Sequence, residues 1–430
     1  MANNFIDELR WRGLVHDVMP GTEDQLSKEM TTLYIGFDPT ADSLHIGSLV
    51  PIILLVHAEK AGHKPIALVG GATGMIGDPS GKSDERNLLD EATLNKNLQG
   101  IKAVLSRFLN FDSDTDNAPI LVNNYDWMKD FTFIDFARDI GKRITVNYMM
   151  AKDSVKKRIS GEGEGMSFTE FTYQLVQGYD FYHLYKNFDC KLQMGGSDQW
   201  GNITTGTELI RRIGNGKGFA ITCPLITKSD GSKFGKSEGG NVWLDAKRTS
   251  AYKFYQYWLN SSDVDAEKYI KIFTFLTKSE IEVLTEEHKD APHLRLLQKR
   301  LASEITTMVH SKEDFENAEK ASNILFSKSF KEDIQSLEEA LFLDVFDGVP
   351  QAEIDRASVE NGLDMIAALS AKTNFLNSNG EARRALKENS VSVNKAKVNE
   401  NYKIGTEDLI NDSYVVLNKG KRNTYIIKVV

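Results

Sequence analysis

Residues 33–48 read LYIGFDPTADSLHIGS, and this stretch decides the fold. Its apolar start predicts a buried strand over Leu33–Phe37, and a loop with Pro39 and Asp42 then leads to a helix over Ile46–Ala61. Four more short apolar runs predict strands, at Pro65–Gly70, Pro119–Asn123, Lys191–Gly195 and Phe219–Ile226. Helical patterns lie between them, at Leu94–Leu109, Ile134–Ile140, Phe168–Lys186 and Gln199–Ile213. Because strands that alternate with helices form parallel sheets, we expect an α/β fold with a Rossmann-like, doubly wound parallel sheet.

The pattern changes after Ile226. A loop rich in Gly, Ser and Lys precedes a purely helical stretch over Ala251–Val309, and short helices with alternating β-type runs follow from Asn361. We therefore expect four parts: a Rossmann-like domain at 1–226, a loop and helical domain at 227–327, a linker at 328–360 and a small α+β domain at 361–430.

Composition is that of a soluble globular protein, with 41% hydrophobic and 26% charged residues in 430. The longest apolar run, Leu49–Val56, is far shorter than the roughly 20 residues of a membrane span, and the first residues lack the features of a signal peptide. Cys190 and Cys223 have no metal-ligand spacing, so we expect two buried thiols, no metal site and a reducing, cytoplasmic location.

Charge is distributed unevenly along the chain, whose net charge is −9. Residues 361–430 carry eleven Lys and Arg against seven Asp and Glu, whereas the rest of the chain is acidic. A basic terminal domain on an acidic body suggests that this domain binds a polyanion, although chance composition remains an alternative on charge alone.

Two familiar nucleotide-binding loops are absent. The stretch Gly77–Ser83 resembles a P-loop, but the glycine that this loop needs at its start is replaced by Ile76. No GxGxxG pattern occurs either. The sequence therefore argues against a P-loop ATPase and against a nicotinamide dehydrogenase.

Polar clusters follow the predicted strands, where ligands of parallel sheets bind, at Gly36–His45, Gly70–Arg86, Asn123–Asp126 and Gly195–Gln199. In the first cluster, Thr40 and His45 precede a helix start, whose free N–H groups suit phosphate, and Gly47 would let a flat base approach. In the loop after the last strand, Lys233 and Lys236 flank Gly235 as a flexible cationic clamp for a triphosphate.

A third set of polar residues occupies one helix face. Tyr173, Gln177 and Asp180 are spaced i, i+4 and i+7, so they share a side of the predicted helix. A phenol, an amide and a carboxylate together suit a zwitterion or a hydroxyl, and a solvent-facing surface is the alternative.

The order of these pieces resembles the class I aminoacyl-tRNA synthetases, with HIGS at 45–48 and KFGKS at 233–237 in the places of the HIGH and KMSKS signatures. The face of Tyr173, Gln177 and Asp180, together with Tyr34 and the stretch Gly77–Lys82, is similar to the bacterial type of tyrosyl-tRNA synthetase. The resemblance covers essentially the whole chain. The second histidine of HIGH is Ser48 here, which can donate a hydrogen bond but carries no charge.

The resemblance implies roles for the matching positions. The phenol of substrate tyrosine would contact Tyr34 and Asp180. Its ammonium group would be held by Asp78, Tyr173, Gln177 and Gln199. ATP would be bound by Gly36, Asp38, Thr40, His45, Gly47, Ser48 and Asp198. The pyrophosphate would be gripped by Lys82, Arg86, Lys233, Lys236 and Ser237.

The implied reaction needs no general base, because the carboxylate of tyrosine is already a nucleophile toward the α-phosphorus of ATP. ATP with Mg²⁺ is then a substrate, and tyrosine passes from the adenylate to the 3′-terminal adenosine of tRNA(Tyr). The resemblance also implies a homodimer, with tRNA crossing between subunits. In the basic domain, RNA contacts are predicted for Arg383, Arg384, Lys387, Lys419, Lys421 and Arg422.

Two other functions remain to be weighed. A catalytically inactive relative that binds RNA for regulation would have no reason to keep His45, Lys233 and Lys236. A tryptophan-specific enzyme of the same family is the second alternative, and the pairing of Tyr34 with Asp180 favours a phenol over an indole.

Overall fold

The computed structural model describes residues 4–80, 90–159, 165–232, 234–237, 240–324, 330, 334, 337–420 and 423–430. The chain divides into two compact units. The first contains Met1–Thr249 and Tyr257–His310, and the second contains Ser250–Gln256 and Ser311–Val430. The predicted four-part division stays a prediction.

A six-stranded sheet of the described residues forms the centre of the first unit, in the order β1-β6-β5-β2-β3-β4. Its strands are β1 (Asp17–Val18), β2 (Thr32–Phe37), β3 (Lys64–Val69), β4 (Ile120–Asn123), β5 (Cys190–Gly196) and β6 (Phe219–Cys223). Strands β2 to β6 are parallel to one another, and β1 pairs antiparallel with β6 at the edge. The five predicted strands and the parallel, doubly wound sheet are confirmed, whereas β1 was not predicted.

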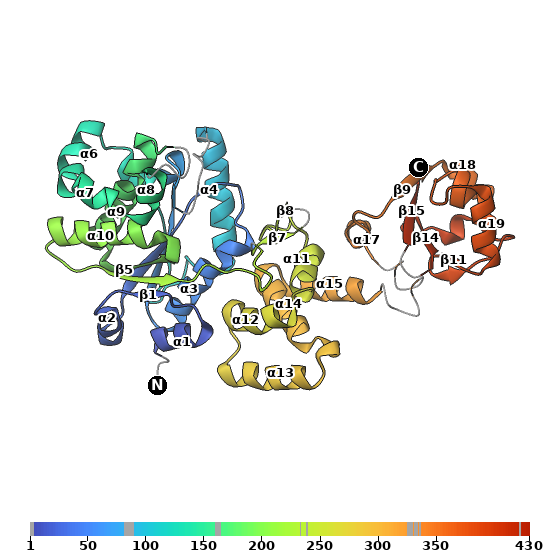
Figure 1. The fold of residues 1–430 in the computed structure, drawn as a ribbon, viewed down its shortest axis with the longest axis horizontal. Helices are drawn as coiled ribbons and strands as arrows, with labels where there is room; N and C mark the ends of the chain where they lie inside the picture. Colours follow the sequence, from blue (N-terminus) through green and yellow to red (C-terminus); the bar gives the residue numbers. More distant parts are fainter. Residues whose placement is uncertain are drawn as a thin grey trace. The chain divides into compact units, whose positions relative to one another are not determined.

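Helices cover both faces of this sheet (Figure 1). On one face, α9 (Phe168–Phe188) and α10 (Trp200–Ile213) pack together, and Phe181 and Ile210 meet Tyr34 and Ile66 of the strands in one buried cluster. On the other face lies α3 (Leu49–Lys60), which is buried nearly all round because it packs against both the sheet and α12 (Asp263–Phe273).

The remaining helices of the first unit are short connections and a helical region after the sheet. Those before or within the sheet region are α1 (Phe5–Arg12), α2 (Thr22–Lys28), α4 (Glu91–Leu105), α5 (Tyr125–Met128), α6 (Phe133–Asp139), α7 (Val146–Met150) and α8 (Asp153–Ile159). Single turns are η1 (Ile46–Ser48), η2 (Thr73–Met75), η3 (Gly141–Arg143), η4 (Ser197–Gln199) and η5 (Pro292–Leu294). After the sheet come α12, α13 (Lys278–Asp290) and α14 (Leu296–Val309). Helix α11 (Ala251–Leu259) precedes them in the chain, and its residues up to Gln256 belong to the second unit.

The strand order defines where a ligand can bind. The chain runs from β2 outward to β3 and β4, and then returns to place β5 and β6 on the opposite side of β2. The carboxyl ends of β2 and β5 therefore flank the topological switch point, where the connections leave in opposite directions and open a crevice.

A small hairpin, β7 (Lys236–Ser237) and β8 (Gly240–Asn241), lies between the sheet and the helical region. Just before it, the ring of Phe234 stacks on Phe273 of α12 at 5.2 Å and also meets Trp258 and Tyr269. This aromatic cluster anchors the start of the hairpin to the helices.

The second unit contains a five-stranded sheet of described residues, in the order β12-β11-β14-β15-β9. Its elements are α15 (Lys312–Ile324), α17 (Glu339–Val345), β9 (Gln351–Ile354), α18 (Arg356–Glu360), β10 (Leu363–Asp364), η6 (Ala367–Ala371), α19 (Asn379–Lys387), β11 (Val391–Val393), β12 (Ala396–Lys397), β13 (Lys403–Ile404), η7 (Thr406–Asp408), β14 (Tyr414–Lys419) and β15 (Asn423–Val429). Strand β9 lies in the segment expected to be a linker, and it pairs in parallel with β15. The sequence pattern after Asn361 predicted a helix near Gly380–Asn389 and β-type runs at Tyr414–Leu417 and Tyr425–Val430, and these correspond to α19, β14 and β15.

Of the helices in the described ranges, none combines the length and the apolar character that a membrane crossing requires. Cys190 and Cys223 are both free and buried, as the sequence predicted.

Candidate active site

A cavity of about 230 Å³ lies at the switch point. Eight of the predicted site residues line it together: Tyr34, Gly36, Asp38, Asp78, Tyr173, Gln177, Asp180 and Gln199. They come from β2, the segment after η2, α9 and η4, so the fold brings together positions that are up to 165 residues apart, as from Tyr34 to Gln199.

One end of the cavity carries a hydroxyl and a carboxylate. Tyr34 and Asp180 are each about 1% exposed. The Asp180 carboxylate accepts hydrogen bonds from Asn124 Nδ2 at 2.9 Å and from Trp127 Nε1 at 2.8 Å. The Tyr34 hydroxyl has no hydrogen-bond partner among the residues that the structure describes. A ligand with a hydroxyl group can donate a hydrogen bond to Asp180 and accept one from Tyr34 here.

Burial controls the charge of this end. It raises the pKa of Asp180 to about 7, although the hydrogen bonds from Asn124 and Trp127 act in the opposite direction. Burial also raises the pKa of Tyr34 well above 10, so this phenol stays protonated. Asp180 is therefore poised to change its protonation state near neutral pH.

A second group of side chains orders the opposite wall. Gln199 Nε2 donates to Asp78 Oδ2 at 2.7 Å, and Gln199 Oε1 accepts from Gln177 Nε2 at 3.3 Å. Asp78 also accepts from the backbone N–H of Ser80 at 2.9 Å. This chain fixes the direction of the amides, and it leaves a carboxylate at the wall that can attract a cationic group.

Asp38 adds a second carboxylate. Its oxygens accept from the Tyr173 hydroxyl at 3.0 Å and from Thr73 Oγ1 at 2.8 Å. Tyr173 is buried, and with Gln177 and Asp180 it faces the cavity from α9. The helix face predicted from the i, i+4, i+7 spacing therefore faces a cavity and is not a solvent surface.

Of the nucleotide candidates, Gly36 and Asp38 line the cavity, whereas Thr40, His45, Gly47, Ser48 and Asp198 are not among its lining residues. His45 caps η1, because its Nδ1 accepts the backbone N–H of Gly47 at 3.0 Å. This contact assigns the proton of a neutral ring to Nε2, which is left as a donor. Thr40, Ser48 and Asp198 are partly or fully exposed, and Asp198 lies in η4 beside Gln199.

The histidine-bearing and lysine-bearing segments are in contact. The backbone N–H of Val242 donates to Gly235 O at 3.0 Å, and Val242 O accepts from Ile46 N at 2.9 Å. Gly235 adopts φ +90°, which favours glycine, and a Cβ there would lie 3.5 Å from the side chain of Ile46. The backbone of one residue, Val242, thus connects both signature segments.

Several predicted residues cannot be placed as side chains. Lys82, Arg86 and Lys233 lie outside the described residues, and of Lys236 and Ser237 the structure describes only the backbone of β7. Their roles stay predictions.

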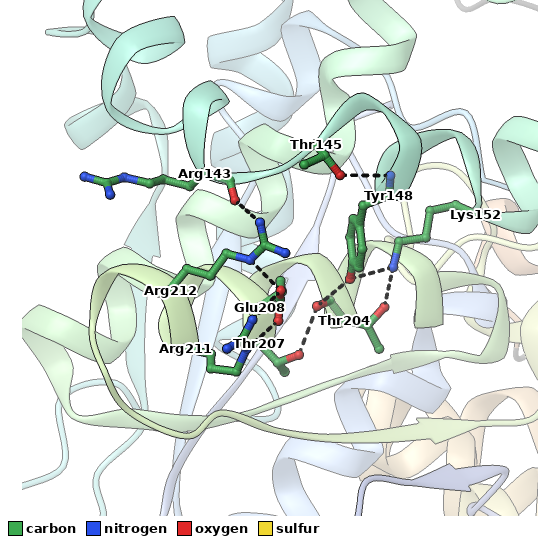
Figure 2. A network of polar contacts seen from close by, with 9 residues as sticks. All are labelled: Arg143, Thr145, Tyr148, Lys152, Thr204, Thr207, Glu208, Arg211 and Arg212. Atoms are coloured by element: carbon green, nitrogen blue, oxygen red, sulfur yellow. Dashed lines mark hydrogen bonds and ion pairs between the residues drawn. The ribbon is translucent and has the colours of Figure 1, made fainter.

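A polar network supports the helix that begins just after Gln199 (Figure 2). Lys152 Nζ donates to the Tyr148 hydroxyl and to Thr204 Oγ1, both at 2.8 Å, and the Tyr148 hydroxyl donates to Thr204 O at 3.1 Å. The network attaches α7 and its neighbours to α10, so it helps to hold the end of α10 that carries Gln199.

The sequence interpretation did not name four residues that shape the cavity: Thr73, Asn124, Trp127 and Gln193. Gln193 is buried in β5 and its Oε1 has no hydrogen-bond partner among the described residues. An amide inside an otherwise apolar strand was a signal for it. Asn124 lies in a polar cluster that was noted after the third predicted strand, but Trp127 carried no comparable signal.

The RNA-binding candidates lie in the second unit. Arg383, Arg384 and Lys387 are exposed on α19, whereas Ala382, Ala385 and Leu386 bury its other face. Lys419 ends β14, and its ammonium group donates to Glu381 of α19 at 2.6 Å. Lys421 and Arg422 lie outside the described residues.

Comparisons with known proteins place these features in context. Residues 26–327 match the model of the family described as tRNA synthetases class I (W and Y), and residues 342–427 match that of the tyrosine–tRNA ligase SYY-like C-terminal domain. The tyrosine–tRNA ligase of Flavobacterium johnsoniae is 71% identical over 99% of this chain and 100% of its own length. That of Porphyromonas gingivalis is 61% identical over 99% of each chain. Among solved structures, a C-terminally truncated mitochondrial tyrosyl-tRNA synthetase of Aspergillus nidulans aligns with a TM-score of 0.68 and 31% identity, over 75% of this chain and 94% of that one.

Proposed function

The chain belongs to the class I tRNA synthetases for tryptophan and tyrosine, and we infer that it catalyses the tyrosine–tRNA ligase reaction. It activates L-tyrosine with ATP to tyrosyl-adenylate and pyrophosphate, and it then transfers tyrosine to the 3′-terminal adenosine of tRNA(Tyr). The observation that carries this choice of amino acid is the buried pairing of Tyr34 and Asp180 in one cavity. An indole offers only a donor, whereas a phenol hydroxyl satisfies a donor and an acceptor at once.

We assign the cavity to tyrosine. The Asp180 carboxylate accepts a hydrogen bond from the substrate hydroxyl, and the Tyr34 hydroxyl donates one to its oxygen. A substrate without the hydroxyl leaves Tyr34 without a partner and deprives Asp180 of a hydrogen bond beyond those from Asn124 and Trp127. Discrimination of this kind is a difference in buried hydrogen bonding, and tyrosyl-tRNA synthetases are its standard example. The opposite wall, with Asp78, Gln177 and Gln199, receives the ammonium group.

We assign ATP to the helix start beside the cavity. His45 Nε2 is left as a donor, and the N–H groups of η1 and α3 attract phosphate. The other candidates for ATP are Gly36, Asp38, Thr40, Gly47, Ser48 and Asp198. Mg²⁺ enters with ATP as part of the substrate.

Catalysis then consists of positioning and charge stabilisation. The tyrosine carboxylate attacks the α-phosphorus, and Lys233, Lys236 and Ser237, with Lys82 and Arg86, grip the departing pyrophosphate more tightly in the transition state than in the ground state. The contact of Val242 with both Gly235 and Ile46 supports this assignment, because it joins the segment that bears the lysines to the one that bears His45.

Exchange of labelled pyrophosphate into ATP tests this function. We expect exchange that depends on L-tyrosine, with phenylalanine and tryptophan as controls that support little or none. Exchange with tryptophan but not with tyrosine would establish the sibling specificity, and absence of exchange with any amino acid would favour the inactive RNA-binding alternative.

We further propose a homodimer that forms through an apolar patch on α6 and the start of α9. Phe133 and Phe168 are 72% and 66% exposed and their rings lie 6.3 Å apart, and Ile134, next to Phe133, is 73% exposed. Monomeric proteins rarely expose clustered aromatic side chains of this size. The two buried thiols suit a reducing compartment, and we place the enzyme in the cytoplasm.

Substitution within the patch tests the dimer. Phe168→Asp should shift the mass measured by light scattering from two chains to one, since a charge would be buried at the interface. Val283→Asp is a matched control, because Val283 is 59% exposed on α13, outside the patch. A wild-type protein that is monomeric at micromolar concentration would rule out this proposal without affecting the reaction assigned above.

A further inference from the structure

A ring of four side chains connects the loop of His45 to the segment that follows the β7–β8 hairpin. Asp42 forms ion pairs with Arg248 and, at 2.9 Å, with Lys96 of α4. The Arg248 guanidinium lies 4.5 Å from the centre of the Trp243 ring, and that ring meets the ring of His45 edge-on, with centres 6.2 Å apart and planes at 71°. Asp42 and His45 belong to one loop, and Trp243 and Arg248 belong to the other segment.

Backbone contacts follow the same path. Leu244 N donates to Leu44 O at 2.8 Å, and His45 and Trp243 form an antiparallel bridge. Helix α4 also touches the loop, because a Cβ on Gly100 would lie 1.9 Å from the backbone oxygen of Asp42. The loop is therefore held by backbone pairing on one side and by the Asp42 ion pairs on the other.

From this arrangement we propose that Trp243 and Arg248 are positioning residues for ATP: they hold the His45 loop in register with the lysine-bearing hairpin. This inference rests on the proposed function and deepens it. It assigns to Trp243 and Arg248, which have no role so far, an effect on the use of ATP and none on the binding of tyrosine. Neither residue lines the cavity of Tyr34 and Asp180.

The ion pair between Asp42 and Arg248 should affect the reaction rate much more than the stability of the fold. Arg248 and Asp42 are both partly exposed, and ion pairs in such places contribute about 0–1 kcal/mol to folding. A displacement of a reacting group by about 1 Å, in contrast, can cost a factor of roughly 10² in rate. Loss of the ion pair between Asp42 and Arg248 should therefore change kcat/KM for ATP far more than it changes the free energy of unfolding.

Kinetics of tyrosine-dependent pyrophosphate exchange by the full-length protein test the inference. We expect Arg248→Met to lower kcat/KM for ATP about tenfold, while KM for tyrosine stays within about twofold and Tm within a few degrees. Arg248→Lys keeps a cation for Asp42 and should recover part of the loss. Arg300→Met removes another exposed arginine that pairs with a carboxylate, Glu304, and should leave both constants unchanged.

A double-mutant cycle makes the test sharper. Asp42→Asn should lower kcat/KM for ATP at least as much as Arg248→Met, because it removes the ion pair with Lys96 as well as that with Arg248. The double variant should be no worse than Asp42→Asn alone, because Arg248 has then already lost its carboxylate partner. Additive losses, or equal losses for ATP and tyrosine, would overturn the inference. If Arg248→Met does not fold, Asp42→Asn alone carries the comparison of the two substrates. An inactive wild-type protein would instead refute the proposed function, whereas an active wild type with unaltered variants would refute only this inference.

Discussion

The hydroxyl of Tyr34 and the carboxylate of Asp180 line one cavity, and of these two only the carboxylate has hydrogen-bond partners among the described residues. A buried hydroxyl without a partner costs stability, since it has lost water and gained nothing in return. A phenolic ligand supplies the hydrogen bond that the Tyr34 hydroxyl lacks in the protein alone. Recognition of tyrosine and the stability of the empty protein are linked through this one oxygen.

Replacement of Tyr34 by Phe tests that link. We expect the free energy of unfolding of the empty protein to rise by about 1–2 kcal/mol, because the unsatisfied hydroxyl is removed without a change of shape. The preference for tyrosine over phenylalanine, measured as the ratio of kcat/KM in pyrophosphate exchange, should fall about tenfold. A variant that is less stable than the wild type would show that the hydroxyl has a partner in solution.

The raised pKa of Asp180 predicts a pH dependence of tyrosine binding. The empty protein takes up a proton on this carboxyl as pH falls through about 7, whereas the bound phenol requires the ionised form as acceptor. Affinity for tyrosine should therefore weaken about tenfold between pH 8 and pH 6, with proton release on binding near pH 6.5. Calorimetry in buffers of different ionisation enthalpy measures both quantities, and Asp180→Asn should abolish the dependence.

The same shift affects the stability of the empty protein in a defined direction. The pKa of Asp180 lies above its ordinary value of 3.8, so the unfolded chain loses this proton first as pH rises. The contribution of Asp180 to stability is complete below pH 4 and is lost as pH rises toward 7. A stability profile that is flat over this range, in the wild type and in Asp180→Asn alike, would contradict the assignment.

Much of this site followed from the sequence because local patterns encode it. Tyr173, Gln177 and Asp180 share a face through helix geometry alone, and polar residues after strands meet at one edge of a parallel sheet by topology. Strand β1 was not predicted because it has only two residues, which are too few to show an alternation of apolar and polar side chains. They form a strand only because they pair with β6, some two hundred residues later.

Contacts between distant segments were also invisible in the sequence. The hydrogen bond of Trp127 to Asp180 and the ion pairs of Asp42 depend on how loops fold back, which no hydrophobic period specifies. Strand β9 had no detectable alternation because it joins an edge of its sheet, beside β15, and buries only part of its surface.

Lys236 is the next position to test, since its segment adjoins His45. We expect Lys236→Ala to lower kcat for adenylate formation roughly 10²-fold and to leave the dissociation constant of tyrosine nearly unchanged, because the cation acts on charge that develops in the transition state. Stopped-flow measurement of adenylate formation with saturating tyrosine separates the two constants. A weakened affinity for tyrosine with an unchanged rate of adenylate formation would show that Lys236 does not bind the departing pyrophosphate.

The exposed cations of α19 predict a separation between the two half-reactions. Replacing Arg383, Arg384 and Lys387 together by Ala should leave pyrophosphate exchange intact and raise KM for tRNA, because these side chains lie in the second unit, whereas the tyrosine cavity lies in the first. Ala382, Ala385 and Leu386 keep the helix packed, so the fold should survive. If each cation contacts a phosphate, the slope of log affinity for tRNA against log salt should fall by about 2–3.

The control for this prediction removes the same charge elsewhere. Lys278, Lys289 and Arg300 are three exposed cations of the first unit, on α13 and α14, and their joint replacement by Ala changes the net charge equally. Should the control triple weaken tRNA binding as much as the α19 triple, attraction by net charge would explain the effect and α19 would not be a specific contact. Should only the α19 triple raise KM for tRNA while exchange continues, the basic domain recognises the nucleic acid and the cavity acts on tyrosine independently of it.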